Sequence, residues 1–596
     1  MIFKSVTIKK RDFLLVFLKL TPFTTVIEIM NLLLSALIPA ITTIAVANFI
    51  DTVINVFNGQ QAQHAIILPL IIIFGCVLYD YIRIAIADMI YIFQDNAMKF
   101  FLRPEVISKK TKLEYKHIED KEVWELINRV TQEPEKIFFQ GKNNLFMIIT
   151  MIVQIVSLLG IVMSSVWWVG IVMTLIGFPL FKLAMKLGKR TNEQFKKVSK
   201  IERRLDYFTE ILTDREHAQE RLLFSFSPKL TEKWLQLFYQ ANKIHDDAQL
   251  YRIVRMKLSS LLVLLVDAFI IFILMLSLRA GMLSIGMFIA VVTALLSLIQ
   301  RMSWELAWMT SEYSRIGELL NDFNQFVELT EKDHAESLPA DMSGFLVKSI
   351  EFKNVSFKYP HTDHYVLKNC SFYLDGNSHY AFVGVNGSGK TTIIKLLTGL
   401  YDDYEGQILI NDQELNKYSF AQLKGLFALV FQDFAKYEIS LEDNIMIGNP
   451  LLEDNKQFEK VIKELKLKEI LRSLPAGVKT PLGKILKNSK DLSVGQWQRL
   501  ALARLLYANK KINILDEPTA ALDPMAESEI YKIFHEVAKN KFVLYITHRM
   551  GAAKIADQIL VIDKGTIIEQ GSHEELLAMN NGKYAKMYNR QKWWYF

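Results

Sequence analysis

The chain has 596 residues, more than one compact hydrophobic core accommodates, so two or more domains are expected. Hydrophobic residues make up 51% of the sequence and charged residues only 22%, a balance that argues against an ordinary soluble protein and favours membrane-spanning segments. The formal net charge of +7 is small for this length, and the cysteines, Cys76 and Cys370, make neither a metal-ligand spacing nor an expected disulfide.

The first half contains six apolar segments, most of which approach or exceed the roughly 20 residues that cross a bilayer. They are Pro22–Ile50, Ala65–Ile92, Leu145–Met163, Trp167–Phe181, Leu258–Leu278 and Met282–Ile299, the fourth being expected to continue toward Leu187. The N-terminal stretch MIFKSVTIKKRDF has no short apolar segment with a cleavage site, so it is interpreted as a cytoplasmic tail. Lys and Arg concentrate in that tail and in the loops 99–142 and 187–257, which predicts that both termini and both loops are cytoplasmic.

Both long loops show apolar residues at helical spacing between charges, in KLEYKHIEDKEVWELINRV and ERRLDYFTEILTDREHAQERLLF. The membrane helices are therefore expected to continue into the cytoplasm as rods. Several ionisable residues fall inside the apolar segments or at their ends, where a polar pathway and a structural role are both open. They are Glu28, Asp80, Arg83, Asp88, Asp267, Arg301 and Glu305, of which Asp80 and Arg83 are spaced to pair on one helix face.

Polar, proline-containing sequence at residues 331–344 predicts a domain boundary, with a transmembrane domain at 1–325, a linker at 326–345 and a nucleotide-binding domain at 346–596. In the second domain the strand-like YAFVGV runs into GVNGSGKTT and the helix-like IIKLLTGL, the order of a phosphate-binding loop. Lys390 is predicted to reach the outer phosphates and Thr391 to offer its hydroxyl to Mg²⁺. The predicted nucleotide-binding residues of the loop are Gly384, Val385, Asn386, Gly387, Ser388, Gly389, Lys390, Thr391 and Thr392.

Further along, the apolar strand in INILDEPTAALD precedes Asp516, predicted to hold Mg²⁺, and Glu517, placed as general base for the attacking water. His548 ends the strand in KFVLYITHR and could contact the γ-phosphate. Gln432 could join Mg²⁺ and sense the γ-phosphate, and the Tyr359 ring could stack on adenine. Taken singly, each of these last two residues is more typical of a structural role than of a nucleotide contact.

A second anion-binding pattern occurs in DLSVGQWQRLALAR, where Ser493, Gly495 and Gln496 precede an apolar helix pattern and present backbone N–H groups. The order of an aromatic residue, GVNGSGKT, a glutamine loop, LSVGQ, ILDEP, AALD ending at Asp523, and a histidine resembles the ATP-binding-cassette (ABC) family. Six membrane helices fused ahead of the cassette resemble an ABC exporter half-transporter. The resemblance implies an α-helical membrane domain of six transmembrane helices with long cytoplasmic extensions plus an α/β P-loop cassette.

The resemblance also implies how the second pattern is used, because in this family the LSGGQ-type signature completes the ATP site of the opposing cassette. Two chains would then enclose two ATP molecules with Mg²⁺, and hydrolysis would drive alternating access. Two residues depart from the family pattern: Val494 replaces a glycine, and Lys484 in TPLGKIL replaces an acidic residue. Since the expected catalytic and signature groups are otherwise present, a homodimer is favoured, with a heterodimer left open.

The cargo is indicated by one segment, LDYFTEILTDREHAQERLLFSF, which is similar to the second cytoplasmic loop of exporters for lanthipeptides and other modified antimicrobial peptides. We therefore expect a lipid-embedded exporter of such a peptide in the bacterial cytoplasmic membrane. The alternatives are a lipid or multidrug exporter, and an ATP-dependent sensor or resistance module without net transport. An ABC ATPase acting on nucleic acid is excluded by the predicted spans.

Overall fold

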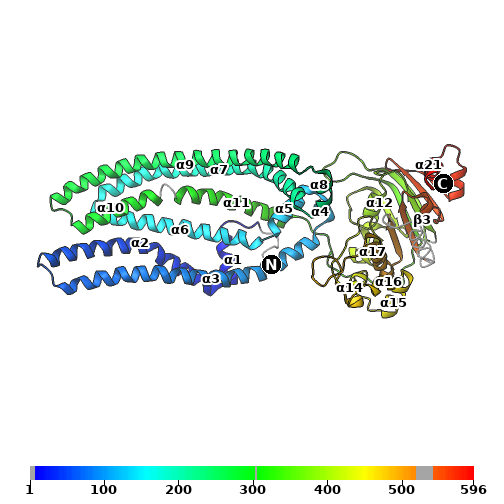
Figure 1. The fold of residues 1–596 in the computed structure, drawn as a ribbon, viewed down its shortest axis with the longest axis horizontal. Helices are drawn as coiled ribbons and strands as arrows, with labels where there is room; N and C mark the ends of the chain where they lie inside the picture. The colour runs from blue at the N-terminus through cyan, green and yellow to red at the C-terminus, as the bar shows by residue number, and fades with distance from the viewer. Residues whose placement is uncertain (1–6, 216, 302–304, 377, 518–540, 596) are drawn as a thin grey trace. The chain divides into compact units, whose positions relative to one another are not determined.

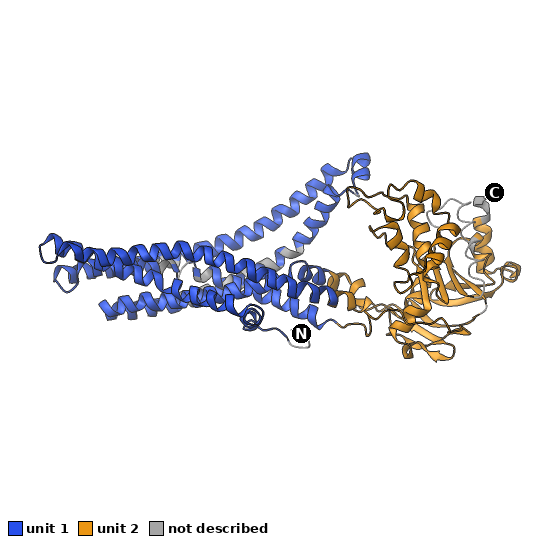
Figure 2. Cartoon of the chain, turned by 90° about the horizontal axis from the view of Figure 1, so that it is seen from below, with its two compact units in different colours: residues 1–108, 125–329 blue, residues 109–124, 330–596 orange. Residues whose placement is uncertain are grey.

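The computed structural model describes residues 7–215, 217–301, 305–376, 378–517 and 541–595. Its contacts divide the chain into two compact units (Figure 2). The helical unit comprises Met1–Ser108 and Glu125–Leu329, and the cassette unit comprises Lys109–Trp124 and Thr330–Phe596. The short segment Lys109–Trp124 thus packs with a domain that begins more than two hundred residues later in the sequence.

The helical unit consists of long α-helices, of which α7 and α9 lie side by side over much of their length (Figure 1). Several helices start with proline in the first turn, where its missing N–H costs no hydrogen bond, as in α2, α6 and α9. The helices are α1 (Asp12–Leu20), α2 (Pro22–Phe57), α3 (Ile67–Lys112), α5 (Lys121–Thr131), α6 (Pro134–Ser165), α7 (Trp167–Thr213), α8 (Ala218–Phe224), α9 (Ser227–Arg279), α10 (Ile285–Gln300) and α11 (Leu306–Glu328).

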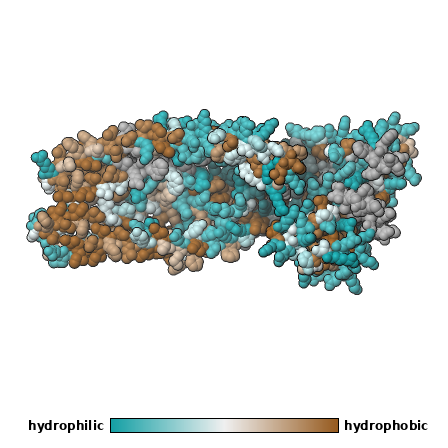
Figure 3. Space-filling view, viewed as in Figure 1, coloured by the Kyte–Doolittle hydropathy of each residue, from teal (hydrophilic) through white to brown (hydrophobic). Residues whose placement is uncertain are grey.

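Four helices of the described residues are long and apolar enough to cross a membrane. They lie within Pro22–Phe57, Gln63–Lys112, Pro134–Ser165 and Ser227–Arg279, and two shorter apolar helices occupy Trp167–Pro179 and Ile285–Leu298. Figure 3 shows hydrophobic side chains covering one end of the helical unit. At this end the chain turns from α2 toward α3 and from α9 into α10. As expected, α7 does not end after its apolar segment but continues as one helix to Thr213.

The ionisable residues in these helices differ in their surroundings. Arg83 Nε donates to Asp80 Oδ1 over 3.2 Å, which confirms the predicted pair on one helix face. Arg301 contacts Glu305 at 3.1 Å. Asp267 on α9 is 1% exposed, and neither of its carboxylate oxygens has a hydrogen-bond partner within the described part of the chain.

A buried lysine joins three helices of the same unit. Lys142 on α6 is 2% exposed, and its ammonium donates to both carboxylate oxygens of Glu28 on α2, over 2.7 and 2.9 Å, and to Gln94 on α3, over 2.5 Å. Three phenylalanine rings surround the ammonium with centroids at 4.5 to 5.6 Å, a cation–π arrangement. They belong to Phe17, Phe139 and Phe146. The presence of the Glu28 carboxylate within the apolar helix α2 is therefore explained by its ion pair with Lys142 on α6.

The replacement Lys142→Met should destabilise the helical unit strongly, because it leaves the Glu28 carboxylate without its cation in a buried setting. We expect a loss of about 3–5 kcal/mol, seen as a lower thermal unfolding midpoint of the purified chain. The double replacement with Glu28→Gln should recover much of that loss. Lys136→Met, which removes an exposed lysine, is the control. Equal losses in the single and double variants would contradict the ion-pair explanation.

The cassette unit contains two sheets. A four-stranded antiparallel sheet has the order β2-β1-β4-β5, and a six-stranded sheet has the order β10-β9-β3-β8-β7-β6. The strands are β1 (Ser349–Phe357), β2 (Leu367–Asp375), β3 (His379–Val383), β4 (Glu405–Ile410), β5 (Gln413–Glu414), β6 (Phe427–Val430), β7 (Ile512–Asp516), β8 (Phe542–Thr547), β9 (Gln558–Asp563) and β10 (Thr566–Gly571). Strands β6, β7, β8, β3 and β9 pair in parallel, and the central three are buried along their whole length, as their apolar sequences require.

Helices of the cassette unit pack against these sheets, and most of them lie in the segments that connect the strands (Figure 1). They are α4 (Tyr115–Glu119), α12 (Lys390–Leu397), α13 (Phe420–Leu426), α14 (Leu441–Met446), α15 (Asn455–Glu464), α16 (Lys468–Arg472), α17 (Val494–Ala508), α19 (Met550–Ala553), α20 (His573–Ala578) and α21 (Lys583–Tyr595). Helix α17 contributes Trp497 and Tyr507 to the hydrophobic core, and both side chains are buried.

Candidate functional site

The predicted nucleotide-binding residues gather at the carboxyl ends of the parallel strands. The ladder sets Val383 of β3 opposite Thr547 of β8, and Asp516 of β7 opposite Ile546 of β8. The phosphate loop, Glu517 and His548 therefore all start at the same edge of the sheet. This edge is the usual ligand-binding side of an open parallel sheet.

The phosphate loop runs from β3 into α12. Gly387 and Gly389 have φ of +77° and +109°, and a Cβ on Gly384 would lie 2.4 Å from the carbonyl oxygen of Ile562. Lys390 folds back and donates to the carbonyl oxygens of Gly384 (2.9 Å) and Val385 (3.0 Å), and burial lowers the pKa of its ammonium. The positive φ angles and the close approach at Gly384 favour glycine at these positions, and a glycine-rich turn of this kind can direct backbone N–H groups toward an anion.

One polar atom in the loop lacks a partner. The Ser388 hydroxyl is buried and makes no hydrogen bond to any residue that the structure describes. A buried hydroxyl without a partner is costly, and a phosphate oxygen in the loop would satisfy it. The loop thus fits a nucleoside phosphate by shape and by its unsatisfied donor.

Two oxygen ligands stand together beside the loop. Thr391 Oγ1 donates to Asp516 Oδ2 over 3.1 Å, and Asp516 is 3% exposed at the end of β7. Burial raises the pKa of the Asp516 carboxyl to about 6. Hydroxyl and carboxylate oxygens are the ligands that Mg²⁺ prefers, so this pair fits the metal of a Mg–nucleotide complex. Gln432, the second residue after β6, is exposed.

The predicted base and histidine are in contact. His548 Nδ1 lies 2.6 Å from Glu517 Oε1, although the two residues are 31 positions apart. Glu517 has φ +48°, a left-handed conformation that is unfavourable for a side chain with a Cβ, and its N–H donates to Ile546 O over 2.9 Å. Backbone strain of this kind is concentrated at functional positions, where the surrounding structure holds it in place.

Tyr359 is placed next to the phosphate-loop helix. Its hydroxyl hydrogen-bonds the Thr392 hydroxyl over 3.0 Å, and its ring packs edge-on against Phe357 and Tyr401 at centroid distances of 5.1 and 5.6 Å. Asp523, by contrast, lies outside the described residues.

The second anion-binding pattern forms the start of α17. Ser493 is the N-cap, its hydroxyl accepting from Gln496 N (3.3 Å), while Gln496 Oε1 accepts from Ser493 N (2.9 Å) in a capping box. The Val494 side chain is 54% exposed. Within the described part of one chain, no hydrogen bond or ion pair joins Ser493–Gln496 to the phosphate loop.

Lys484, which replaces the acidic residue of the family pattern, is accommodated locally. Its ammonium lies 3.1 Å from Asp491 Oδ2, and the other oxygen of Asp491 accepts from Trp497 Nε1 over 3.2 Å. Glu438 Oε2 accepts from the backbone N–H groups of Lys484 and Ile485, both over 2.9 Å. Lys484 therefore forms an ion pair with Asp491, the residue just before the LSVGQ segment.

The family resemblance implies that the first loop, near Tyr115–Trp124, acts on the cassette, but sequence reasoning did not identify the residue pairs that join them. Glu119 on α4 accepts from Lys395 Nζ over 2.5 Å and from the Tyr401 hydroxyl. The Tyr401 ring packs edge-on against Tyr115 of α4 at 5.7 Å and against Tyr359 at 5.6 Å. A continuous set of contacts thus connects α4 to Tyr359 and, through it, to Thr392. Nothing in the local sequence could have indicated contacts between residues 276 or more positions apart.

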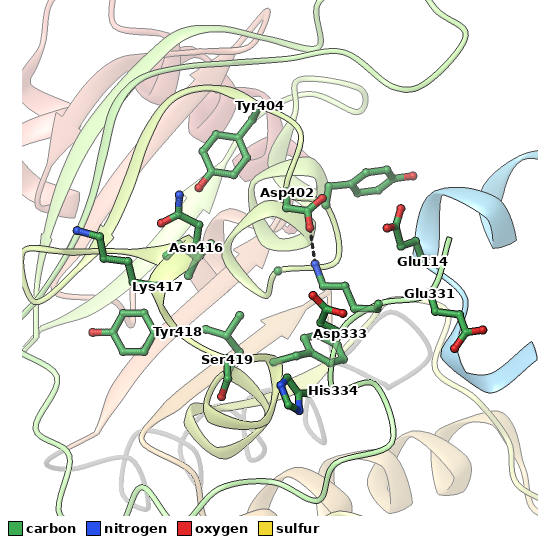
Figure 4. A pocket seen from close by; sticks show the side chains of 16 residues that line it. Glu114, Glu331, Asp333, His334, Asp402, Tyr404, Asn416, Lys417, Tyr418 and Ser419 are labelled. Carbon is green, nitrogen blue, oxygen red and sulfur yellow. Dashed lines mark hydrogen bonds and ion pairs between the residues drawn. The ribbon is translucent and has the colours of Figure 1, made fainter. Parts of the chain in front are cut away.

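A cavity of about 420 Å³ lies beside this contact and not at the phosphate loop (Figure 4). It is lined by Glu114, residues 331–334, residues 399–404 and the segment 415–423. Two of the lining residues, Lys332 and Asp402, form an ion pair at 2.7 Å. The segment that follows α11 is thereby attached to the cassette next to α4.

Comparison with known proteins agrees with this geometry. The family description "ABC transporter" matches residues 367–520. The subtilin transport ATP-binding protein SpaT of Bacillus subtilis is 35% identical over 489 residues, covering 80% of this chain and 77% of that protein. The nisin transport ATP-binding protein NisT of Lactococcus lactis subsp. lactis is 27% identical, covering 81% and 80%. An ATP-dependent lipid A-core flippase of Mannheimia succiniciproducens is 29% identical, covering 78% of each.

Among solved structures, a bacterial Atm1-family ABC exporter with ATP bound matches with a TM-score of 0.72 at 24% identity, over 94% of this chain and 98% of that one, which shows the same fold. This chain belongs to the ABC transporter family. It is an integral membrane half-transporter of the exporter type, with a helical membrane domain fused to a cassette that binds ATP and couples its hydrolysis to transport.

The raised pKa of Asp516 predicts a stabilising substitution. Because folding lifts this pKa above its ordinary value of 3.8, the charged carboxylate opposes folding, fully above about pH 6 and not at all below about pH 4. Asp516→Asn should therefore raise the stability of the nucleotide-free chain by about 1–3 kcal/mol at pH 7.5. The gain, measured as a thermal midpoint, should shrink as the pH falls to 4.5. A gain that is the same at both pH values, or one matched by the exposed Glu453→Gln control, would contradict this account.

The contact between α4 and the cassette predicts coupled variants. Glu119→Gln and Lys395→Met should each lower the thermal midpoint, and the double variant should lose clearly less than the sum, because both singles remove the same ion pair. The expected interaction energy is about 0.5–1 kcal/mol, since Glu119 is partly exposed. Glu122→Gln, on the adjoining exposed helix surface, should change nothing. Strict additivity would show that the pair does not stabilise the contact.

Proposed function

We propose that this chain works as a homodimer that exports a modified, lanthipeptide-type peptide from the cytoplasm. The observation that carries the dimer is the division of one ATP site into two separate halves. The phosphate loop has a buried hydroxyl without a partner among the described residues, and the helix start at Ser493 presents its backbone N–H groups elsewhere. A second copy would bring its Ser493–Gln496 segment onto the phosphates held by the first.

In the proposed site each residue has one task. The loop from Gly384 to Thr392 and the Tyr359 ring bind ATP, and Thr391, Asp516 and Gln432 hold Mg²⁺, which neutralises phosphate charge. Glu517 accepts the proton of the attacking water. Its 2.6 Å contact with His548 supports a joint role, in which the imidazole orients the carboxylate and faces the γ-phosphate. Asp523 is proposed to complete the site.

The membrane domain is proposed to cover residues 1–325 and the cassette 346–596, joined by residues 326–345. The four long apolar helices and the two shorter ones support six spans per chain, with both termini and the cassette in the cytoplasm. Closure of the cassettes is proposed to reach the membrane helices through α4 and through the region 214–226. Three apolar side chains at the end of α8 support that second role, because 73–80% of each is exposed and a docking partner would bury them. They are Leu222, Leu223 and Phe224.

Two observations support the proposal that the cargo is a peptide: the sequence of the second cytoplasmic loop and the names of two relatives. The loop segment 205–226 is similar to that of exporters of modified antimicrobial peptides, and two relatives are named for the transport of subtilin and nisin. A lipid cargo is the second candidate, because other relatives are named lipid A-core flippases at similar coverage. A sensor or resistance module without net transport is distinguished by the absence of cargo flux in vesicles.

The decisive measurement is ATP hydrolysis by the chain alone in lipid nanodiscs. We expect basal activity that rises severalfold with a leader-bearing lanthipeptide precursor and not with lipophilic drugs. Glu517→Gln should lower kcat by at least 100-fold while leaving ATP binding intact, because it removes the base and keeps the shape of the site. Stimulation by lipid or drugs instead of peptide would move the cargo to the second candidate. No activity above the Glu517→Gln background would contradict the homodimer.

A further inference from the structure

The C-terminal helix α21 reaches the loop that carries His548. Gln591 Nε2 donates to the carbonyl oxygen of His548 over 2.6 Å, and Gln591 Oε1 accepts from the backbone N–H of Met550 over 2.9 Å. One side-chain amide thus bonds the backbone on both sides of Arg549, as a neighbouring strand would. The two bonds fix the carbonyl and the amide that follow β8, and a side-chain amide suits them because it carries a donor and an acceptor side by side without a change of protonation.

The helix that carries Gln591 is itself firmly held. Its first N–H groups, those of Lys583 and Tyr584, donate to the Glu569 carboxylate of β10 over 2.5 and 3.0 Å. The Tyr584 side chain is fully buried, and its hydroxyl pairs with His573 Nδ1 at 2.7 Å. Gln591 lies about two helical turns after these contacts, on a helix whose first turn they hold in place.

The His548 backbone is constrained from the other side as well. Thr547 Oγ1, at the end of β8, accepts from Arg549 N over 3.0 Å. With Gln591, three hydrogen bonds hold the backbone from residue 547 to residue 550. The imidazole can then turn only about its own side-chain bonds, and its contact with Glu517 Oε1 is kept at 2.6 Å.

We propose that Gln591 is a positioning residue for ATP hydrolysis, which acts by fixing the backbone of His548 and so the His548–Glu517 contact. This inference rests on the roles proposed above for His548 and Glu517. A catalytic group displaced by about 1 Å can lose about 100-fold in rate, whereas ATP binding by the phosphate loop does not involve this backbone. Loss of Gln591 should accordingly lower kcat and spare the affinity for ATP.

The test uses the full chain in nanodiscs with the variants Gln591→Ala, Gln591→Glu, His548→Ala and their combination. Gln591→Glu keeps an acceptor for Met550 N but removes the donor to His548 O, so it separates the two bonds. The matched control is Asn589→Ala, which removes an exposed amide from the same helix. Steady-state kcat and KM for ATP are measured together with hydrogen–deuterium exchange of the peptide that spans residues 545–552.

We expect Gln591→Ala and Gln591→Glu to lower kcat about fivefold or more, to change KM less than twofold and to speed exchange in that peptide, while Asn589→Ala does neither. In the His548→Ala background the same change should lower the residual rate less than 1.5-fold, because the group it positions is gone. A normal kcat with faster exchange, or equal changes in kcat and KM, would overturn the proposal and leave Gln591 a structural clamp.

Two results separate this proposal from the one on which it rests. If His548→Ala has the kcat of the unmodified chain, the role of His548 is wrong, whatever Gln591 does. If His548→Ala lowers kcat but Gln591→Ala does not, only the positioning role fails. Where the His548→Ala rate falls to the Glu517→Gln background, the kcat and KM values of the single Gln591 variants decide.

Discussion

The parallel pairing of β3, β8 and β7 is the interaction on which the site depends. Its register pairs Val383 with Thr547 and Asp516 with Ile546, one residue earlier on β8, so three segments far apart in the sequence leave the sheet side by side. A slip of one residue would turn every side chain of a strand to the other face and would move Asp516 away from Thr391. The buried apolar strands that fix the register thus also fix the distances between the nucleotide-binding groups.

That sheet holds polar groups under unfavourable conditions. Lys390 and Asp516 are buried with shifted pKa values, the Ser388 hydroxyl has no partner among the described residues, and Glu517 has a left-handed backbone. Each feature costs stability in the nucleotide-free chain. If these residues bind Mg–ATP as proposed, the ligand would offset the costs by supplying anionic and cationic partners, and its binding would stabilise the folded chain.

The sequence was sufficient wherever function is encoded by neighbouring residues. The glycine loop, the helix start at Ser493 and the Asp80–Arg83 pair follow from local spacing. Motif order assigned Thr391, Asp516, Glu517 and His548 to one site, and the structure adds the contacts of Thr391 with Asp516 and of Glu517 with His548. Pairs without such a pattern were not predictable. Lys395 with Glu119, Gln591 with His548, and Lys142 with Glu28 join residues 276, 43 and 114 positions apart, and their partners are set by tertiary packing alone.

The start of α17 shows why the signature segment can bind a phosphate that its own chain does not hold. The capping box occupies the Ser493 hydroxyl and the Gln496 amide oxygen, but the N–H groups of Val494 and Gly495, first in the helix, have no acceptor within it. An anion meets these two amides and the positive end of the helix dipole. Val494 is exposed, and valine has the same backbone N–H as glycine. Replacing the family's glycine by valine therefore adds a side chain beside the proposed phosphate position without removing a donor. In the proposed homodimer, these donors would act on the partner's ATP only when two cassettes close, which would make hydrolysis a property of the closed pair.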